Sequence, residues 1–372
     1  MHLRGLAIGV VLAGCGGGHP APAPAAGSDL AAQAEAAYNA PDLTRSFPLA
    51  KQACDANSAF GCTLLGLHYQ DARGAPWDHP AAVAAYEKAC ALGDGTGCFN
   101  LESMYRGGHG VTVDNKIADE LHAKARAKWQ AQCDGGEPRR CVNVAYLVST
   151  DGPPTADSRA RVYALDKQAC DAGDPEGCGV LPRAALEAGK LTAAEYVAQS
   201  DAQCTKGIAD ACLELGATLK AGDGERGVAQ DAMRGTGLLH RACSLGSPAG
   251  CYWAEEYEAA CDRGYAQGCA AMAAKEVDQA RAAELAKRGC QGGDAASCEL
   301  IARDYRLGHG VTHDDATAIT WAREACSMGR PAMCGILMMK GLELPVPPEA
   351  LPALYKSACD SGVSPACSHV SK

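Results

Sequence analysis

The clearest pattern of apolar and polar positions belongs to a segment that occurs three times, beginning at Cys62, Cys98 and Cys298. Each copy carries leucine, methionine or tyrosine side chains along one face of an expected helix, which then ends in a glycine-rich loop. An aspartate follows the loop and precedes a second helical stretch, as an N-cap or first-turn acid should. These aspartates are Asp78, Asp114 and Asp314. The pattern predicts a unit of two helices joined by a short loop.

Twenty of the 21 cysteines form ten pairs that share one spacing, Cys-x₇-Cys. Residues eight apart in one helix are separated by ~12 Å, whereas the two Cα atoms of a disulfide lie about 4.4–6.8 Å apart. The chain must therefore reverse direction between the two cysteines, and we expect every disulfide to join the members of one pair. The pairs are Cys54-Cys62, Cys90-Cys98, Cys133-Cys141, Cys170-Cys178, Cys204-Cys212, Cys243-Cys251, Cys261-Cys269, Cys290-Cys298, Cys326-Cys334 and Cys359-Cys367.

The residue three places after the first cysteine shows how the chain reverses. It is asparagine in the first pair and glycine in the other nine, and both residues tolerate the left-handed conformation that ends a helix. The first cysteine is thus expected on the last turn of one helix and the second on the first turn of the next. The positions are Asn57, Gly93, Gly136, Gly173, Gly207, Gly246, Gly264, Gly293, Gly329 and Gly362.

The repeat length indicates the fold class. First cysteines recur at intervals in the mid-thirties, such as 36 residues from Cys54 to Cys90 and 36 from Cys290 to Cys326. Such a period is typical of solenoids built from helix pairs. We therefore predict an all-α protein, an α/α solenoid stapled by disulfides.

Three motifs resemble the Sel1-like repeat family, which is related to tetratricopeptide repeats. They are Leu65-Gly66-Leu67-His68-Tyr69, then Gly108-His109-Gly110-Val111 with Asp114, then Ala85-Tyr86-Glu87-Lys88-Ala89. The cysteine pairs make the chain most similar to the disulfide-bearing branch, the Helicobacter cysteine-rich protein group. The resemblance covers roughly residues 29–372 and implies a right-handed superhelix of helix pairs.

The repeat is interrupted in two regions. Only nine residues separate Cys251 from Cys261, too few for two helices, and the unit that follows lacks the Gly-x-Gly-Val loop and suggests two short helices. Pro182 lies inside an expected helix and should kink or shorten it. We expect irregular units near 178–190 and 248–275, the second of which would divide the solenoid into two arms.

The N-terminal segment has the pattern of an export signal. A short basic start and an apolar run too short to span a bilayer end in Leu12-Ala13-Gly14-Cys15, which resembles the lipobox of bacterial lipoproteins. The resemblance implies lipidation of Cys15; the alternative is an ordinary cleaved signal with an incidental cysteine. The predicted organisation is a signal peptide at 1–14, a lipidated flexible tether at 15–28 and the solenoid at 29–372, with helices at 29–38 and 365–370.

Composition agrees with export. The formal net charge is −10 and the isoelectric point about 5.5, which argue against binding of nucleic acid. Ten disulfides need an oxidising compartment. We expect a location in the bacterial cell envelope, with a lipid anchor as the membrane attachment and the solenoid facing the periplasm or the exterior.

The chain contains few motifs of known chemistry. The cysteine-rich branch has been associated with penicillin binding and slow β-lactam hydrolysis, but the chain contains no Ser-x-x-Lys, Ser-Asp-Asn or Lys-Thr-Gly. It also contains no His-Glu-x-x-His zinc motif and no phosphate-binding loop. Cysteine pairs with seven residues between them, one of which is a helix-ending glycine, suit disulfides better than zinc. We expect no catalytic residue, no metal and no cofactor.

Two kinds of polar residue remain as candidates. His109 and His309 occupy equivalent Gly-His-Gly-Val loops, either as metal or pH-sensing contacts or as solvated turn residues, and the second interpretation is favoured. Asn100 and Asn143 lie two residues after second cysteines, where tetratricopeptide relatives bind peptide backbone; the alternative is a solvated helix face. The sequence thus predicts a scaffold that binds a protein or peptide. The alternative function is a β-lactam-binding or slowly hydrolysing protein.

Overall fold

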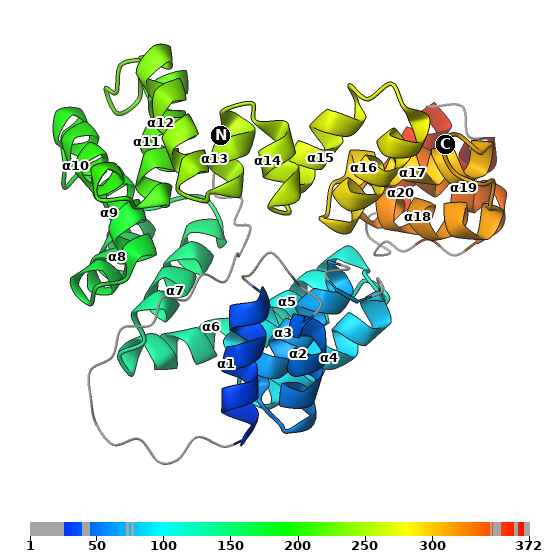
Figure 1. Ribbon diagram of the computed structural model, residues 1–372, viewed down its shortest axis with the longest axis horizontal. Coiled ribbons are helices and arrows are strands. Elements are labelled where there is room, and N and C mark those ends of the chain that lie inside the picture. The colour runs from blue at the N-terminus through cyan, green and yellow to red at the C-terminus, as the bar shows by residue number, and fades with distance from the viewer. Residues whose placement is uncertain are drawn as a thin grey trace. The chain divides into compact units, whose positions relative to one another are not determined.

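The protein is built from short helices, most of them 13 residues long (Figure 1). The computed structural model describes residues 26–38, 45–71, 74–75, 78–342, 344, 351–360 and 364–367, and within these it has helices and one isolated β-bridge but no strand. The helices are α1 Ala26–Tyr38, α2 Ser46–Asp55, α3 Ala59–Gln70, α4 His79–Ala91, α5 Gly95–Gly107, α6 Asn115–Asp134, α7 Pro138–Thr150, α8 Ala156–Asp171, α9 Pro175–Glu187, α10 Ala193–Thr205, α11 Ala209–Ala221, α12 Ala232–Ser244, α13 Pro248–Trp253, α14 Tyr257–Asp262, α15 Ala266–Ala273, α16 Gln279–Gln291, α17 Ala295–Leu307, α18 Asp315–Ser327, α19 Pro331–Met339, α20 Leu351–Asp360 and α21 Ser364–Cys367.

Each Cys-x₇-Cys pair joins the end of one helix to the start of the next. All ten pairs are disulfide-bonded, with Cα–Cα separations of 4.3–4.8 Å. In the α4–α5 turn, Gly93 has φ 101°, and Asp94 caps α5 through a hydrogen bond from the Thr96 N–H of 2.9 Å. The predicted helix-pair solenoid with disulfides is confirmed. Each such small loop contributes up to ~2.5 kcal/mol by restricting the unfolded chain.

A second feature of the turn went unpredicted. A Cβ added to Gly97, the residue before the second cysteine, would lie 2.5 Å from the Cβ of Ala89, the residue before the first. The same close approach occurs between Gly177 and Ala169, at 2.6 Å. Larger residues at these positions would force apart the two backbones that the disulfide holds together.

The chain divides into two compact units. Unit 1 is Arg126–Met272, and unit 2 combines Ile8–Ala125 with Ala273–Lys372, each as far as described. Within unit 1 the first helices of successive repeats, α7, α9, α11 and α13, pack directly against one another; α3 and α5 do so in unit 2. One boundary, at 272/273, falls inside the predicted break at 248–275.

The two irregular regions differ from expectation. Pro182 does not shorten its helix, because α9 runs through it for 13 residues. Between Cys251 and Cys261 the chain does accommodate two helices, since α13 and α14 are only six residues each and Glu255 turns the backbone with φ 67°. The expectation that nine residues are too few for two helices is wrong, because helices of under two turns need fewer residues than a regular unit.

At the N-terminal end of the described chain, α1 packs on α2 and α3. Buried Ser46 joins these helices, because its hydroxyl donates to the Ala34 carbonyl at 2.8 Å and lies 2.8 Å from Nε2 of His68. Cys15 and the signal segment lie outside the described residues, as do residues 368–370 of the predicted closing helix; α21 covers Ser364–Cys367. None of the described helices is long and apolar enough to cross a bilayer.

Candidate functional site

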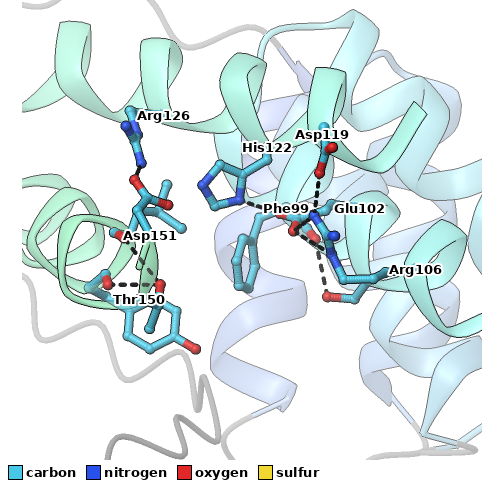
Figure 2. Close-up of polar contacts among 11 residues, drawn as sticks. Phe99, Glu102, Arg106, Asp119, His122, Arg126, Thr150 and Asp151 are labelled. Atoms are coloured by element: carbon cyan, nitrogen blue, oxygen red, sulfur yellow. Dashed lines mark hydrogen bonds and ion pairs between the residues drawn. The ribbon is translucent and has the colours of Figure 1, made fainter. Parts of the chain in front are cut away.

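A buried carboxylate organises the polar face between α5 and α6. Glu102 of α5 has a side chain only 9% exposed and accepts hydrogen bonds from Arg106 at 2.9 and 3.2 Å. Nδ1 of His122, on α6, lies 3.0 Å from the other carboxylate oxygen, and Arg106 also bonds Asp119 at 3.0 Å (Figure 2). The four side chains hold the two helices in one relative position and present a preformed, charged surface beside Phe99.

An ion pair and a hydrogen bond also hold the last turn of α7, in unit 1. Arg126 forms an ion pair with Asp151, and the Thr150 hydroxyl donates to the Tyr146 carbonyl at 3.2 Å (Figure 2). The pair ties the end of a first helix to the second helix before it.

The two asparagines singled out from the sequence have different surroundings. Asn100 is half-buried on α5 and hydrogen-bonds the hydroxyl of Tyr86, which also donates to Gln70 at 2.9 Å. Burial raises the pKa of the Tyr86 hydroxyl well above its ordinary value, and the bond from Asn100 opposes that rise. Asn143 is half-buried on α7. The bond to Tyr86 gives Asn100 a structural role whatever else it binds. The two asparagines belong to different units.

Unit 2 brings together three metal-ligating side chains. His79 is the first residue of α4, His109 lies in the loop after α5, and Glu324 comes from α18. Nδ1 of His79 lies 3.1 Å from one Glu324 oxygen, and Nδ1 of His109 lies 2.7 Å from the other. The two rings meet edge to face with centroids 5.2 Å apart. Although burial raises the pKa of Glu324, the hydrogen bonds and charges of the two histidines outweigh it and bring the pKa to about 2.

The solvated interpretation is therefore wrong for His109, whose side chain is only 19% exposed, whereas His309 is exposed. His79 and Glu324 belong to none of the motifs recognised in the sequence. Glu324 lies two residues before the first cysteine of a pair. In three other repeats the residue at this position donates a hydrogen bond to a carbonyl of the preceding cysteine turn. These bonds join Lys88 to the Cys54 carbonyl, Gln168 to the Cys133 carbonyl and Arg241 to the Thr205 carbonyl. An acid at this position was a signal available in the sequence.

Unit 1 holds a contrasting charged cluster at the starts of α7, α9 and α11. Arg139 pairs with Glu176 and lies 3.7 Å from Asp174, the N-cap of α9. Burial raises the pKa of Glu176 to about 7; Arg139 opposes the rise, while Asp210 and Asp174 add to it. Burial also raises the pKa of Asp210. One arginine thus faces three carboxyl groups.

Other candidate chemistry is limited within the described residues. A second group of possible metal ligands contains Cys243, Cys251 and Glu256, but its two sulfurs are bonded to each other. A cavity of about 10 Å³ beside α17, α18 and α19 has room for about one water molecule.

No family model matches the chain. Cytochrome c oxidase assembly factor 7 of Xenopus tropicalis is 39% identical over 87 residues, which are 23% of this chain and 38% of that protein. Cytochrome c oxidase assembly factor 7A of Xenopus laevis is 42% identical over 76 residues, 20% of this chain and 33% of that protein. The chain thus spans less than two-fifths of the length of these curated relatives.

Among solved structures, an SLR-fold protective antigen of uropathogenic Escherichia coli is 18% identical with TM-score 0.43, covering 92% of this chain and 78% of that one. A Sel1 repeat protein from Oxalobacter formigenes is 18% identical with TM-score 0.35, covering 84% and 86%. These structural neighbours are Sel1 repeat proteins, and the ten bonded cysteine pairs fit a cysteine-rich repeat protein.

Proposed function

We propose that the chain is an exported scaffold that binds a protein or peptide segment along the first helices of its repeats. The observation that supports this most directly is the row of first helices, α7, α9, α11 and α13, packed directly against one another in unit 1. Repeats that contact only their neighbours expose an extended surface, which matches an extended polypeptide better than a small molecule.

The polar face of α5 adds a reason for choosing a polypeptide partner. Glu102, Arg106 and His122 are held by one another, so an incoming chain would meet groups that are already ordered and lose less free energy in ordering them. The related Xenopus proteins are named as assembly factors, which agrees with a binding role; a match over 87 residues transfers no partner.

The test is capture of a partner from envelope extract by the oxidised protein, followed by titration of the identified partner. Asn100→Ala with Asn143→Ala should weaken binding about fivefold to a hundredfold, because amide bonds to a peptide backbone contribute ~0.5–1.5 kcal/mol each. Ser103→Ala, an exposed change on α5, is the matched control and should leave affinity unchanged.

Because Asn100 also bonds Tyr86, each variant needs a thermal melt, and Asn143→Ala alone must weaken binding for the proposal to stand. Equal affinity in wild type and double variant would remove both asparagines from the binding surface. Hydrolysis of nitrocefin by oxidised, metal-free wild type above a denatured control would instead support the β-lactam alternative.

The proposed location has its own test. Lipid attached at Cys15 would hold the protein on the membrane, so Cys15→Ser should move it from the membrane fraction to the soluble periplasm. A processed Cys15→Ser protein that stays in membranes would contradict the lipid anchor and leave the binding proposal intact.

A further inference from the structure

The strongest unexplained feature of unit 2 is the meeting of His79, His109 and Glu324. They come from positions separated by up to 245 residues, and one ligand atom of each lies within 4.8 Å of the other two. Their side chains are 9%, 19% and 11% exposed. A buried carboxylate between two imidazoles is a costly arrangement unless its charge is compensated, by a proton on a histidine or by a cation.

The donor set suits one class of cation. Two imidazole nitrogens and a carboxylate bind zinc and neighbouring divalent transition metals, with bonds of about 2.0–2.2 Å. Tetrahedral ligands at that bond length lie about 3.3–3.5 Å from one another. The nitrogen-to-oxygen distances of 2.7 and 3.1 Å already approach this spacing. Small side-chain movements would open room for an ion.

The backbone fixes two of the donors. The His109 N–H bonds the Met104 carbonyl at 3.0 Å, and Gly108 and Gly110 flank it with φ 71° and 72°. A Cβ on Gly110 would lie 2.5 Å from the backbone carbon of His79, so this loop rests on the start of α4. The two histidines are thereby held together independently of Glu324, as a preformed ligand pair should be.

We propose that His79, His109 and Glu324 form a binding site for one divalent transition-metal ion, zinc or a close neighbour. The site links the α4–α5 region of unit 2 to α18. Three protein ligands leave a fourth position for water or another ligand. The proposal is independent of the binding function above, which concerns the first helices.

The second Gly-His-Gly-Val loop supplies an internal control. There Gln279 occupies the place of His79, since a Cβ on Gly310 would lie 2.0 Å from the Gln279 carbonyl oxygen. The glycines on either side of His309 have nearly the same φ values as those beside His109, but the His309 side chain is exposed. Gln279 also lacks the imidazole nitrogen that His79 offers as a metal ligand. A general affinity of exposed histidines for zinc would involve His309 as much as His109.

The test uses the full, oxidised chain, freed of metal by a chelator and titrated with zinc chloride in a calorimeter. We expect one tight site per chain and, with cobalt(II), the visible absorption bands of a low-coordinate ion. His79→Ala, His109→Ala and Glu324→Gln should each weaken that site at least tenfold, while His309→Ala leaves it unchanged. Zinc should also raise the thermal unfolding midpoint of wild type by a few degrees.

Two results would overturn the proposal: no stoichiometric zinc binding by wild type at micromolar concentration, or a site that survives Glu324→Gln and both histidine changes. The first would mean that the three side chains are joined by a shared proton only. Glu324→Gln keeps the shape and an acceptor oxygen, so it separates loss of a ligand from loss of folding, and circular dichroism checks each variant.

Discussion

Two loops of unit 2 have the same motif and nearly the same backbone, yet their histidines differ in environment. In one loop the N–H of His109 bonds the Met104 carbonyl, and in the other the N–H of His309 bonds the Asp304 carbonyl, both at 3.0 Å. The glycines flanking His309 have φ 72° and 68°, within a few degrees of those flanking His109. Only His109 reaches Glu324.

One residue before the motif accounts for much of the difference. A Cβ on Gly107 would lie 2.3 Å from Nε2 of His109, so the imidazole lies where any larger side chain would be. The equivalent residue in the other loop is Leu307. A leucine there excludes the same ring position from His309. The motif determines the backbone of the loop, and its neighbours determine what the histidine contacts.

The largest expected effect tests the shared backbone. Gly110→Ala and Gly310→Ala should each destabilise unit 2 by about 3 kcal/mol or more, because alanine is strained at these φ values and its Cβ meets backbone atoms at 2.5 and 2.0 Å. The measurement is the urea midpoint of the oxidised protein, followed by circular dichroism.

Gly293→Ala is the matched control for these two changes. Gly293 has φ 90° but open space around the added Cβ, so the cost should be about 1 kcal/mol from backbone strain alone. If the three variants unfold at the same urea concentration, the close contacts of Gly110 with the start of α4 and of Gly310 with the start of α16 do not stabilise the two loops.

A smaller effect tests the difference between the loops. Gly107→Leu makes the first loop like the second and should push the His109 ring away from Glu324 without changing the helix. We expect at least a tenfold loss of zinc affinity and a loss of about 1–2 kcal/mol in stability, because the buried Glu324 keeps one histidine partner instead of two.

Leu307→Gly in the second loop is the reverse control and should leave zinc affinity unchanged. If Gly107→Leu bound zinc as tightly as wild type, the glycine would not be what allows His109 to reach its partner.

The sequence was sufficient for the local parts of this structure. Ten cysteine pairs with a helix-ending glycine predicted the turns, because their geometry depends on residues within one repeat. Asp78 and Asp314, two of the predicted N-cap aspartates, cap helices for the same local reason. Pro182 shows the limit of a local rule, because α9 tolerates it without shortening.

The candidate sites were less predictable because their contacts are long-range. His79 and Glu324 are 245 residues apart, and nothing in either neighbourhood indicates the other. Asn100 was correctly placed on a first helix, α5, but its partner Tyr86 lies on α4, the helix before it. Two residues differ from those at the equivalent positions of other repeats: Gly107, where the other loop has Leu307, and Glu324, where other repeats have hydrogen-bond donors. These differences were the signals of the site that the sequence contained.

The smallest expected effect is a pH dependence of stability that comes from Glu176. This carboxylate is partly buried, like Glu324, but its neighbours are one arginine and two other acids, whereas those of Glu324 are two histidines. Its folded-state pKa of about 7 lies above the ordinary value of 4.5, so between these pH values the folded chain holds a proton that the unfolded chain releases. Stability therefore falls as pH rises from about 5 to 8, by roughly 1 kcal/mol once the flexibility of Arg139 and solvent access are allowed for.

Glu176→Gln should flatten this dependence, because the amide cannot lose a proton: the variant should match wild type at pH 5 and exceed it at pH 8. Arg139, Asp174 and Asp210 face the group and stay in place in the variant, so any remaining slope belongs to them. Glu137→Gln, a change at an exposed acid that directly precedes α7, should keep the wild-type slope. Urea midpoints of all three proteins across this pH range decide the matter. A wild-type stability that rises toward pH 8 would show that the pairing with Arg139 outweighs burial, which would make Glu176 a stabilising carboxylate like Glu324.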